Sequence, residues 1–307
     1  MNQIMTSDSI FVGFDGGGST SRFIVARKNG EPSTHVFAQN LKYTDLGIQE
    51  SAKELSKCLR DILGDDVTSC RSICISLSGA SNQVANAEFI SALRDHMQLQ
   101  DLKIHIESDS SFALKTAYPN DESGMVLIAG TGSVAIARKK NGDIVKVGGW
   151  GRLLGDEGSG YWIGLQALKQ YCKASDANEN QGELFIRVEE VLQTKCGSDF
   201  AAIRRMLYQN ELHPQDFAQL VFEYSDKDLA AKSIIEEAIN ALKAILFTLF
   251  AKVKEECNPT VTLHGTIARH PEIAGAIAED CRKRGLQCRV LSEEAVLQKA
   301  LEVSMQL

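Results

Sequence analysis

The chain has 307 residues, of which 44% are hydrophobic and 24% are charged, and its formal net charge is -7. This length suits two domains with large cores, and an acidic chain without a basic block argues against nucleic acid or an anionic membrane as the main partner. Residues 1–9 contain neither a basic region nor a long apolar stretch, so we expect no signal peptide and a cytoplasmic protein.

The eight cysteines form no C-x-x-C pair, and the six histidines show no H-x-x-x-H spacing. Several of these cysteines fall on apolar faces of expected helices and strands. Reduced core thiols are therefore expected, and a zinc site is not. Cys70 and Cys74 are three residues apart, but Arg71 and the strand around Ile73 argue against metal ligation there.

Residues 10–27 predict a strand, a tight turn and a second strand. An apolar run from Ile10 to Val12 leads to Asp15 and to three glycines, and an alternating run covers residues 22–27. Residues without Cβ let backbone N–H groups approach an anion, and a carboxylate beside them could hold a divalent cation that bridges phosphate oxygens. Taken alone, the same stretch favours an ordinary glycine-rich hairpin over a phosphate site.

The hairpin continues over residues 33–38 and reaches Asn40, on a loop that we expect to overhang a cleft. Three elements should follow: a helix over 48–62 ended by Gly64, a strand over 73–77, and a helix over 82–97 with Val84, Ala87, Phe89 or Ile90, and Leu93 facing inward. Such an alternation of strands and helices is typical of a sheet with helices on its faces.

Asp109 follows a short strand over 103–107 and opens a helix that runs to Tyr118. An acid at the C-terminal end of a strand lies where open α/β sheets place their ligands. Aspartate is also a good helix N-cap, and the local sequence does not decide between the two roles. A second glycine loop begins soon afterwards, which would bring Asp109 near a terminal phosphate.

Residues 125–147 repeat the first pattern. A buried strand leads into a turn of Gly130, Thr131, Gly132 and Ser133, and a second strand ends at a polar corner at Asn141 and Gly142. The endings also match, with residues 26–31 resembling residues 137–143. This duplication predicts two related α/β domains that face each other across a cleft, with two phosphate loops closing on one nucleotide.

The densest glycine segment covers residues 148–160 and precedes a helix over about 161–173. Its paired acids, Asp156 and Glu157, could bind substrate hydroxyls or hydrated magnesium. Trp150 offers a flat apolar face of the kind that packs against a sugar ring, although a core tryptophan is an equal alternative.

The remainder reads as scaffold. We expect amphipathic helices over 181–224 with a break at His213–Pro214, a long helix over 226–255, a strand over 260–263, a helix over 271–284, a strand over 287–291, and a closing helix capped by Ser292. The exception is His264–Thr266, where Gly265 could let the backbone lie flat against an adenine ring.

Together these motifs resemble those of N-acetylglucosamine kinases of the BadF/BadG/BcrA/BcrD ATPase family, within the actin, sugar kinase and Hsp70 superfamily. The motifs that carry the resemblance are residues 15–20, 108–109, 130–133, 149–151 and 155–159. It is strong from Phe11 to Tyr161 and weaker afterwards.

The resemblance implies an α/β fold with two ribonuclease H-like, actin-like ATPase domains flanking a central nucleotide cleft. The N-terminal domain would cover residues 1–119 and be closed by a helix over 292–307, and the C-terminal domain would cover 120–291. It further implies a homodimeric kinase that depends on ATP and Mg2+ and acts on the 6-hydroxyl of an aminosugar. N-acetylglucosamine is the first candidate substrate, and glucosamine and N-acetylmuramic acid are the alternatives.

By the same resemblance Asp109 would be the catalytic base. Phosphate contacts would come from Asp15, Gly16, Gly17, Gly18, Ser19 and Thr20, from Gly130, Thr131, Gly132 and Ser133, and from Gly265 on the adenosine side. Asp15 would hold Mg2+ through water, and sugar contacts would come from Asn40, Thr131, Gly149, Trp150 and Asp156. Two positions depart from the family pattern, because Ser19 replaces a threonine and His264 replaces a glycine.

Two other classes stay open. A reductase-activating ATPase of the superfamily would need glycine-flanked cysteines for an iron–sulfur cluster, and no suitable one occurs. A sugar sensor would usually carry a DNA-binding segment ahead of the first strand, where only nine residues precede Ile10. A catalytically silent binder would take sugar without releasing ADP.

Overall fold

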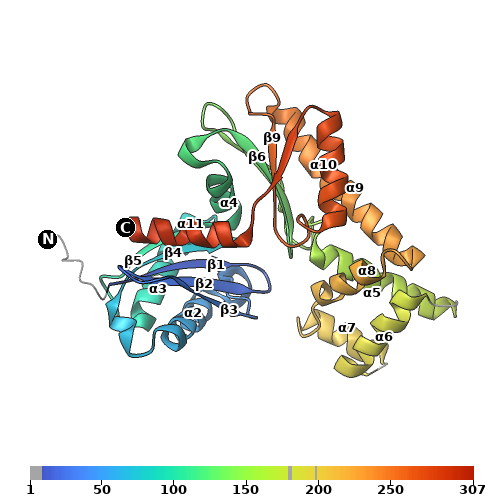
Figure 1. Ribbon diagram of the computed structural model, residues 1–307. Coiled ribbons are helices and arrows are strands. Elements are labelled where there is room, and N and C mark those ends of the chain that lie inside the picture. Colours follow the sequence, from blue (N-terminus) through green and yellow to red (C-terminus); the bar gives the residue numbers. More distant parts are fainter. Residues whose placement is uncertain (1–8, 179–181, 198) are drawn as a thin grey trace. The chain divides into compact units, whose positions relative to one another are not determined.

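The computed structural model describes residues 9–178, 182–197 and 199–307 (Figure 1). The chain divides into two compact units, which we call the first unit (Met1–Asp121 with Leu291–Leu307) and the second unit (Glu122–Val290). The N-terminal residues 1–8 and Gln181, on which two of the sequence predictions fall, lie outside the described residues.

The first unit is built on a five-stranded sheet in the order β3-β2-β1-β4-β5. Its strands are β1 (Ile10–Gly16), β2 (Ser21–Arg27), β3 (Ser33–Phe37), β4 (Cys70–Leu77) and β5 (Lys103–Ser108). The first three form an antiparallel meander, while β4 runs parallel to both β1 and β5. The predicted strand, glycine turn and strand at residues 10–27 are confirmed.

Side chains of β1 alternate between two packed faces, as strand geometry requires. Val12 and Phe14 join a core with α2 (Ile48–Leu63) and α3 (Gln83–Met97). Phe11 packs on the other face against Leu297 and Leu301 of α11 (Glu293–Gln306). Figure 1 shows α11 and the pair α2 and α3 on opposite sides of this sheet.

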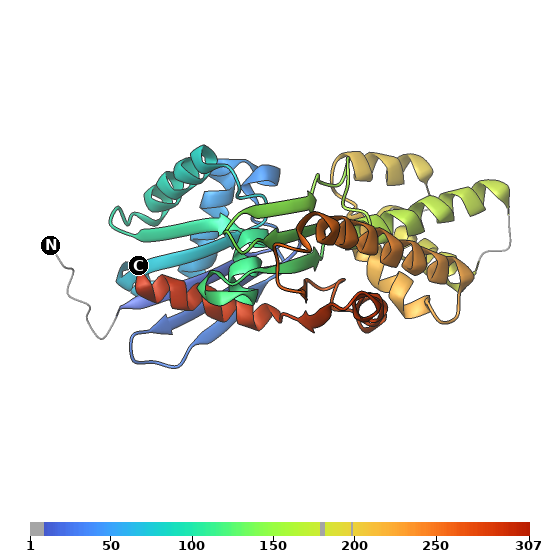
Figure 2. The same cartoon turned by 90° about the horizontal axis from the view of Figure 1, so that it is seen from above.

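The C-terminal helix α11 is bound to the sheet by a buried pair of serines. Ser304 Oγ accepts a hydrogen bond from Val12 N (3.2 Å) and donates to Ser72 O (3.0 Å), while Ser72 Oγ donates to Ser304 O (2.6 Å). Ser292 caps the helix by accepting from Ala295 N, as predicted. Residues from the end of the chain therefore complete the fold of its beginning (Figure 2).

One expectation about α3 is wrong. Val84, expected to face inward, is 69% exposed, and Ala87 is also exposed. The buried residues of α3 are Phe89, Ala92, Leu93 and Met97. Continued toward the N-terminus at helical spacing, this stripe passes through Ala85 and Asn86, so Val84 lies off it.

The second unit repeats the sheet of the first with the same topology. Its strands are β6 (Gly124–Ala129), β7 (Ser133–Arg138), β8 (Ile144–Gly148), β9 (Thr260–His264) and β10 (Gln287–Val290). The order β8-β7-β6-β9-β10 combines an antiparallel meander with two parallel strands, as in the first unit. The duplication predicted from the glycine turns is confirmed.

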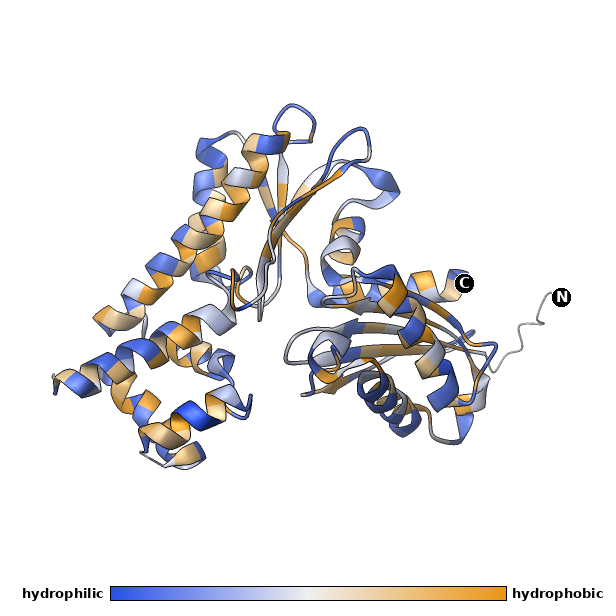
Figure 3. Cartoon of the chain, turned by 180° about the vertical axis from the view of Figure 1, so that it is seen from behind, coloured by the Kyte–Doolittle hydropathy of each residue, from blue (hydrophilic) through white to orange (hydrophobic). Residues whose placement is uncertain are grey.

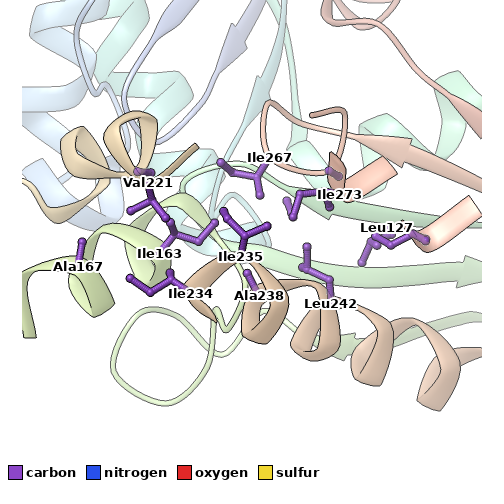
Figure 4. Packing of buried hydrophobic residues seen from close by; sticks show 14 of the residues in the cluster. Leu127, Ile163, Ala167, Val221, Ile234, Ile235, Ala238, Leu242, Ile267 and Ile273 are labelled. Atoms are coloured by element: carbon purple, nitrogen blue, oxygen red, sulfur yellow. The ribbon is translucent and has the colours of Figure 1, made fainter. Parts of the chain in front are cut away.

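Helices cover the second sheet and extend beyond it. They are α5 (Gly160–Ala177), α6 (Glu183–Cys196), α7 (Phe200–Tyr208), α8 (Ala218–Tyr224), α9 (Leu229–Val253) and α10 (Pro271–Lys283). Ile163 of α5, Ile235 of α9 and Leu127 of β6 belong to one buried cluster (Figure 4). Between α6 and α7, Gly197 at φ +69° adds a break that the sequence analysis did not predict.

Hydrophobic residues gather in the sheets and on the inward helix faces (Figure 3). In the described ranges, no helix combines the length and the apolar character that spanning a membrane demands.

Candidate active site

The carboxyl ends of three neighbouring strands meet at one edge of the first sheet. Gly16 of β1 lies opposite Leu77 of β4, which lies opposite Ser108 of β5. Adjacent strands are about 4.8 Å apart, so the backbones after β1 and β5 are separated by about 10 Å at this edge. Asp15 and Asp109 are therefore brought to the same end of the sheet.

Asp15 is a nearly buried carboxylate at the end of β1. It is 8% exposed, and its Oδ1 accepts a hydrogen bond of 2.9 Å from the buried hydroxyl of Ser76. The loop after it is closed by a bond from Gly17 N to Thr20 O (3.0 Å). A Cβ at Gly16 would lie 2.6 Å from Leu77 Cδ1, so a side chain there would displace the core.

Asp109 is the first residue of α4 (Asp109–Ala117), not its cap. The cap is Ser108, whose Oγ accepts from Ser111 N (3.3 Å). Asp109 Oδ1 accepts from Ser110 N at 2.7 Å, which fixes the half-buried carboxylate at the beginning of the helix. The alternative that Asp109 serves as the N-cap is therefore wrong.

An acid just before Asp109 fastens α4 to β5. Glu107 Oε2 on β5 accepts from Lys115 Nζ on α4 (2.8 Å) and lies 3.4 Å from His105 Nε2. Burial favours the neutral form of Glu107, but the hydrogen bonds and charges of His105 and Lys115 outweigh it and lower the pKa of this carboxyl.

Asn40 is held inside its own loop between β3 and α1 (Tyr43–Leu46). Its Nδ2 donates to Asp45 Oδ2 (2.8 Å), and its Oδ1 accepts from Lys42 N (2.9 Å). Thr44, in the helix α1 that follows this loop, would lie 2.9 Å from a Cβ built on Gly79, just beyond β4. The Asn40 loop thus packs near the strand end that also carries Ser76.

In the second unit, the turn of residues 130–133 is bonded to the glycine segment. Ser133 N donates to Asp156 Oδ1 (3.1 Å), and Ser133 Oγ donates to Glu157 O (2.8 Å). Gly160 N donates to Gly130 O (2.8 Å). A Cβ at Gly132 would lie 3.0 Å from Asp156 Oδ2, so the predicted phosphate loop and the predicted sugar segment form one structure.

Trp150 projects from a chain of left-handed glycines and is 74% exposed. Gly149 and Gly151 have backbone φ angles of +70° and +81°, and residues other than glycine rarely adopt such angles. The alternative of a core tryptophan is therefore wrong. Lys146 lies beside this segment, because a Cβ at Gly149 would be 2.9 Å from its Cε and 3.2 Å from its Nζ.

Gly265 has an intramolecular role. Its φ is +92°, and a Cβ there would lie 2.4 Å from Ala129 O. That same oxygen accepts from Ile267 N (2.9 Å) and Ala268 N (3.0 Å), which closes the turn after β9 onto the start of the phosphate loop. Figure 4 shows Ile267 entering the core from this turn.

Three residues near these motifs were missed by the sequence analysis: Ser76, Ser108 as a cap, and Lys146. Ser76 could have been found by pairing the strand over 73–77 with β1, because its position is opposite Asp15. No comparable signal identifies Lys146, whose neighbour Gly149 lies beyond the end of β8.

A sequence model described as the BadF/BadG/BcrA/BcrD ATPase family matches residues 12–293. The chain belongs to this family. The match extends through both sheets of the chain, so the two glycine turns of this ATPase family member lie in the matched region.

Two relatives of this ATPase family member are 28% identical to it. One, from Dictyostelium discoideum, is named N-acetyl-D-glucosamine kinase and aligns over 86% of this chain and 87% of its own length. The other, from Clostridium acetobutylicum, is named N-acetylmuramic acid/N-acetylglucosamine kinase and aligns over 75% and 76%.

A solved structure from Chromobacterium violaceum, assigned as an N-acetylglucosamine kinase, matches with a TM-score of 0.73 at 24% identity. It covers 97% of this chain and 99% of its own length. The expected two-domain, actin-like ATPase fold of the family is confirmed by this match and by the two sheets of equal topology.

Proposed function

We propose that the chain is an ATP-dependent kinase that phosphorylates the 6-hydroxyl of N-acetylglucosamine. The observation that carries this proposal is the edge of the first sheet, where Asp15 near the end of β1 and Asp109 just after β5 lie at the carboxyl ends of parallel strands that are separated by β4 alone. The second unit supports it with a second glycine turn bonded to a segment that presents Trp150. The names of the two relatives at 28% identity support an aminosugar as the acceptor.

Asp109 would act as the general base. Its Oδ1 accepts from Ser110 N, and the caps of α4 fix its backbone, so the carboxylate is positioned before substrate arrives. As the sugar oxygen bonds to the γ-phosphorus of ATP and ADP leaves, the hydroxyl proton would pass to Asp109. Phosphoryl transfer depends mainly on such positioning and on charge neutralisation.

The two glycine loops would hold the phosphates. Backbone N–H groups of residues 16–20 and 130–133 can approach anionic oxygens where no Cβ intervenes. Asp15 is a hard oxygen donor beside the first loop, which suits Mg2+ bound through water. When bound, Mg2+ would supply neutralisation of phosphate charge, and Asp15 would be the residue that positions it.

The sugar would lie against residues 149–156, with Asn40 and Thr131 as further contacts. The exposed indole of Trp150 offers an apolar face to a pyranose ring. The left-handed backbone at Gly149 and Gly151 holds that indole outside the core. The carboxylate of Asp156 accepts a hydrogen bond from Ser133 N of the proposed phosphate loop. The same carboxylate could therefore contact the sugar while it is held next to the phosphates.

N-acetylmuramic acid is a second candidate substrate because a cation lies near the proposed sugar segment. This sugar carries a lactyl carboxylate on O3, and the ammonium of Lys146 packs against Gly149. The relative from Clostridium acetobutylicum carries both sugars in its name. We find no comparable observation that favours glucosamine.

An ADP-release assay over a panel of hexoses and hexosamines, with and without Mg2+, tests the proposal. We expect sugar-dependent ADP release that is largest with an N-acetylated hexosamine and lost without Mg2+. ATP hydrolysis that ignores sugar would point to an ATPase activator, and sugar binding without ADP release would point to a sensor. Either result would overturn the kinase assignment.

A further inference from the structure

The turn that carries Trp150 has a closed backbone. We call residues 150–155 the Trp150 turn. Gly151 O accepts hydrogen bonds from Leu154 N (3.1 Å) and from Gly155 N (2.9 Å). A Cβ at Gly155 would lie 3.2 Å from Trp150 Cβ, so the end of the turn folds back on its beginning. The indole therefore projects from a defined turn.

Burial of apolar side chains does not attach the Trp150 turn to the rest of the second unit. Its two leucines, Leu153 and Leu154, are 90% and 79% exposed, and Trp150 itself is mostly exposed. Exposed apolar groups gain nothing from the hydrophobic effect and do not hold a segment in place. The orientation of the turn therefore depends on polar contacts. One of them, from Ser133 N to Asp156 Oδ1, lies just after the turn.

Arg152 makes two contacts from the middle of the turn. Its Nη2 donates to Asn210 Oδ1 (3.1 Å), just beyond the end of α7. Its guanidinium also lies over the ring of Tyr161, with Cζ 5.7 Å from the ring centroid. Tyr161 is in the first turn of α5, and its N donates to Thr131 O (3.3 Å) in the second glycine turn. Arg152 thus connects the Trp150 turn to the end of α7 and to the start of α5.

The chain around Asn210 is itself fixed. Asn210 N donates to Leu207 O (3.3 Å), and Leu212 N donates to Met206 O (3.1 Å). The side chain of Leu212 is 1% exposed and belongs to the core of the second unit. The acceptor of the Arg152 hydrogen bond is therefore attached to α7 on one side and to the core on the other.

We propose that Arg152 is a positioning residue for the sugar. It holds the Trp150 turn against α7 and α5, so that the indole is in place when a pyranose ring packs on it. The effect on sugar rests on the proposed function, whereas the hold of Arg152 on Trp150 does not. Because Arg152 acts through Trp150, its loss should weaken sugar binding and leave ATP binding unchanged.

Steady-state kinetics of Arg152→Met test the effect on sugar. Methionine keeps an apolar stem and removes the hydrogen-bond donor. We expect KM for N-acetylglucosamine to rise about fivefold, a common loss for one hydrogen bond, with kcat and KM for ATP changed about twofold or less. Arg204→Met, at an exposed position of α7, is the control. An unchanged KM for the sugar, or an equal loss in kcat, would overturn the effect on sugar.

Variants of Asn210 test the contact from its other side. Asn210 has a φ of +55°, so Asn210→Gly removes the acceptor without backbone strain, and Asn210→Asp keeps an acceptor for the guanidinium. We expect Asn210→Gly to raise KM for the sugar, and Asn210→Asp to leave it near the value of the unaltered chain. Adding Asn210→Gly to Arg152→Met should raise KM no further. Additive effects in that double variant would contradict the inference.

Fluorescence anisotropy of Trp150 separates this inference from the proposed function. The chain has two tryptophans, and in a Trp162→Phe background the emission reports Trp150 alone. Without any sugar, Arg152→Met and Asn210→Gly should lower the anisotropy, because the indole gains mobility. The same comparison in the chain with both tryptophans covers a folding defect in Trp162→Phe.

The two readouts fail in different ways. Unchanged anisotropy in both variants would overturn the hold of Arg152 on Trp150. Lowered anisotropy in a chain that releases no ADP with any sugar would support that hold and overturn the kinase assignment alone. Lowered anisotropy together with a raised KM for the sugar supports the whole inference.

Discussion

At the scale of single residues, the site depends on side chains that hold the proposed functional groups in place. Ser76 donates to Asp15 Oδ1 from a neighbouring strand, and Ser108 caps the helix that begins with Asp109. Ser108 belongs to the same motif as Asp109, so its cap is a local contact. Ser76 is 61 residues away from Asp15 in the sequence, and only the folded chain brings the two together.

Ser76→Ala should raise the Mg2+ concentration that gives half-maximal ADP release. The rate of ADP release at saturating Mg2+ should change less. The variant leaves the Asp15 carboxylate without its buried donor, and a lost hydrogen bond to a charged group costs about 1.5–3 kcal/mol. The measurement is the Mg2+ concentration that gives half-maximal ADP release, with the exposed Ser81→Ala as control. An unchanged Mg2+ requirement would show that Ser76 does not position Asp15.

Lys146→Met should separate the two sugar candidates. Removing the ammonium beside Gly149 is expected to reduce kcat/KM for N-acetylmuramic acid by about tenfold, equivalent to about 1.4 kcal/mol, and to spare N-acetylglucosamine. Lys140→Met, in the same hairpin, is the control. An equal change in kcat/KM for both sugars would show that Lys146 does not recognise the lactyl carboxylate.

At the scale of elements, local sequence predicted the strands and glycine turns well, because alternation and glycine are local signals. The inward face of α3 was misjudged at Val84, since a weakly patterned helix does not reveal which stripe the sheet will cover. The role of Gly265 was also out of reach, because the oxygen it must avoid belongs to Ala129, on a strand far away in the sequence.

Gly265→Ala should destabilise the second unit. Its left-handed φ and the 2.4 Å approach of a Cβ to Ala129 O predict a loss of about 2 kcal/mol or more. Gly275→Ala is the matched control, since a Cβ inside α10 meets nothing within 4 Å and should stabilise by about 0.5–1 kcal/mol. Urea midpoints measure both. A neutral Gly265→Ala would contradict the described turn.

The contact between α4 and β5 predicts a pH dependence. The pKa of Glu107 is lowered in the folded chain, so its contribution is complete above the ordinary value of 4.5 and is lost as pH falls through the folded value. Lys115→Met should cost about 0.5 kcal/mol near pH 7 and less as the pH drops below 4.5. Urea titrations at several pH values check this, and a pH-independent difference would contradict it.

At the scale of the whole molecule, a duplicated glycine turn in the sequence predicted a duplicated sheet, and the two sheets have the same strand order. The prediction succeeded because each turn lies between strands whose residues are adjacent in the chain. The return of α11 to the first unit had no local signal and came only from the resemblance to a family. The buried contact between Ser72 of β4 and Ser304 of α11 joins residues that are 232 positions apart in the sequence.

The central claim is that one carboxylate, Asp109, takes the proton of the sugar during phosphoryl transfer. The most direct measurement is sugar-dependent ADP release by Asp109→Asn, together with ATP and sugar binding by calorimetry. The account predicts a fall in kcat of about 10²–10⁴, the usual contribution of a general base, while both ligands still bind. Turnover near that of the unaltered chain, with binding intact, would contradict the account.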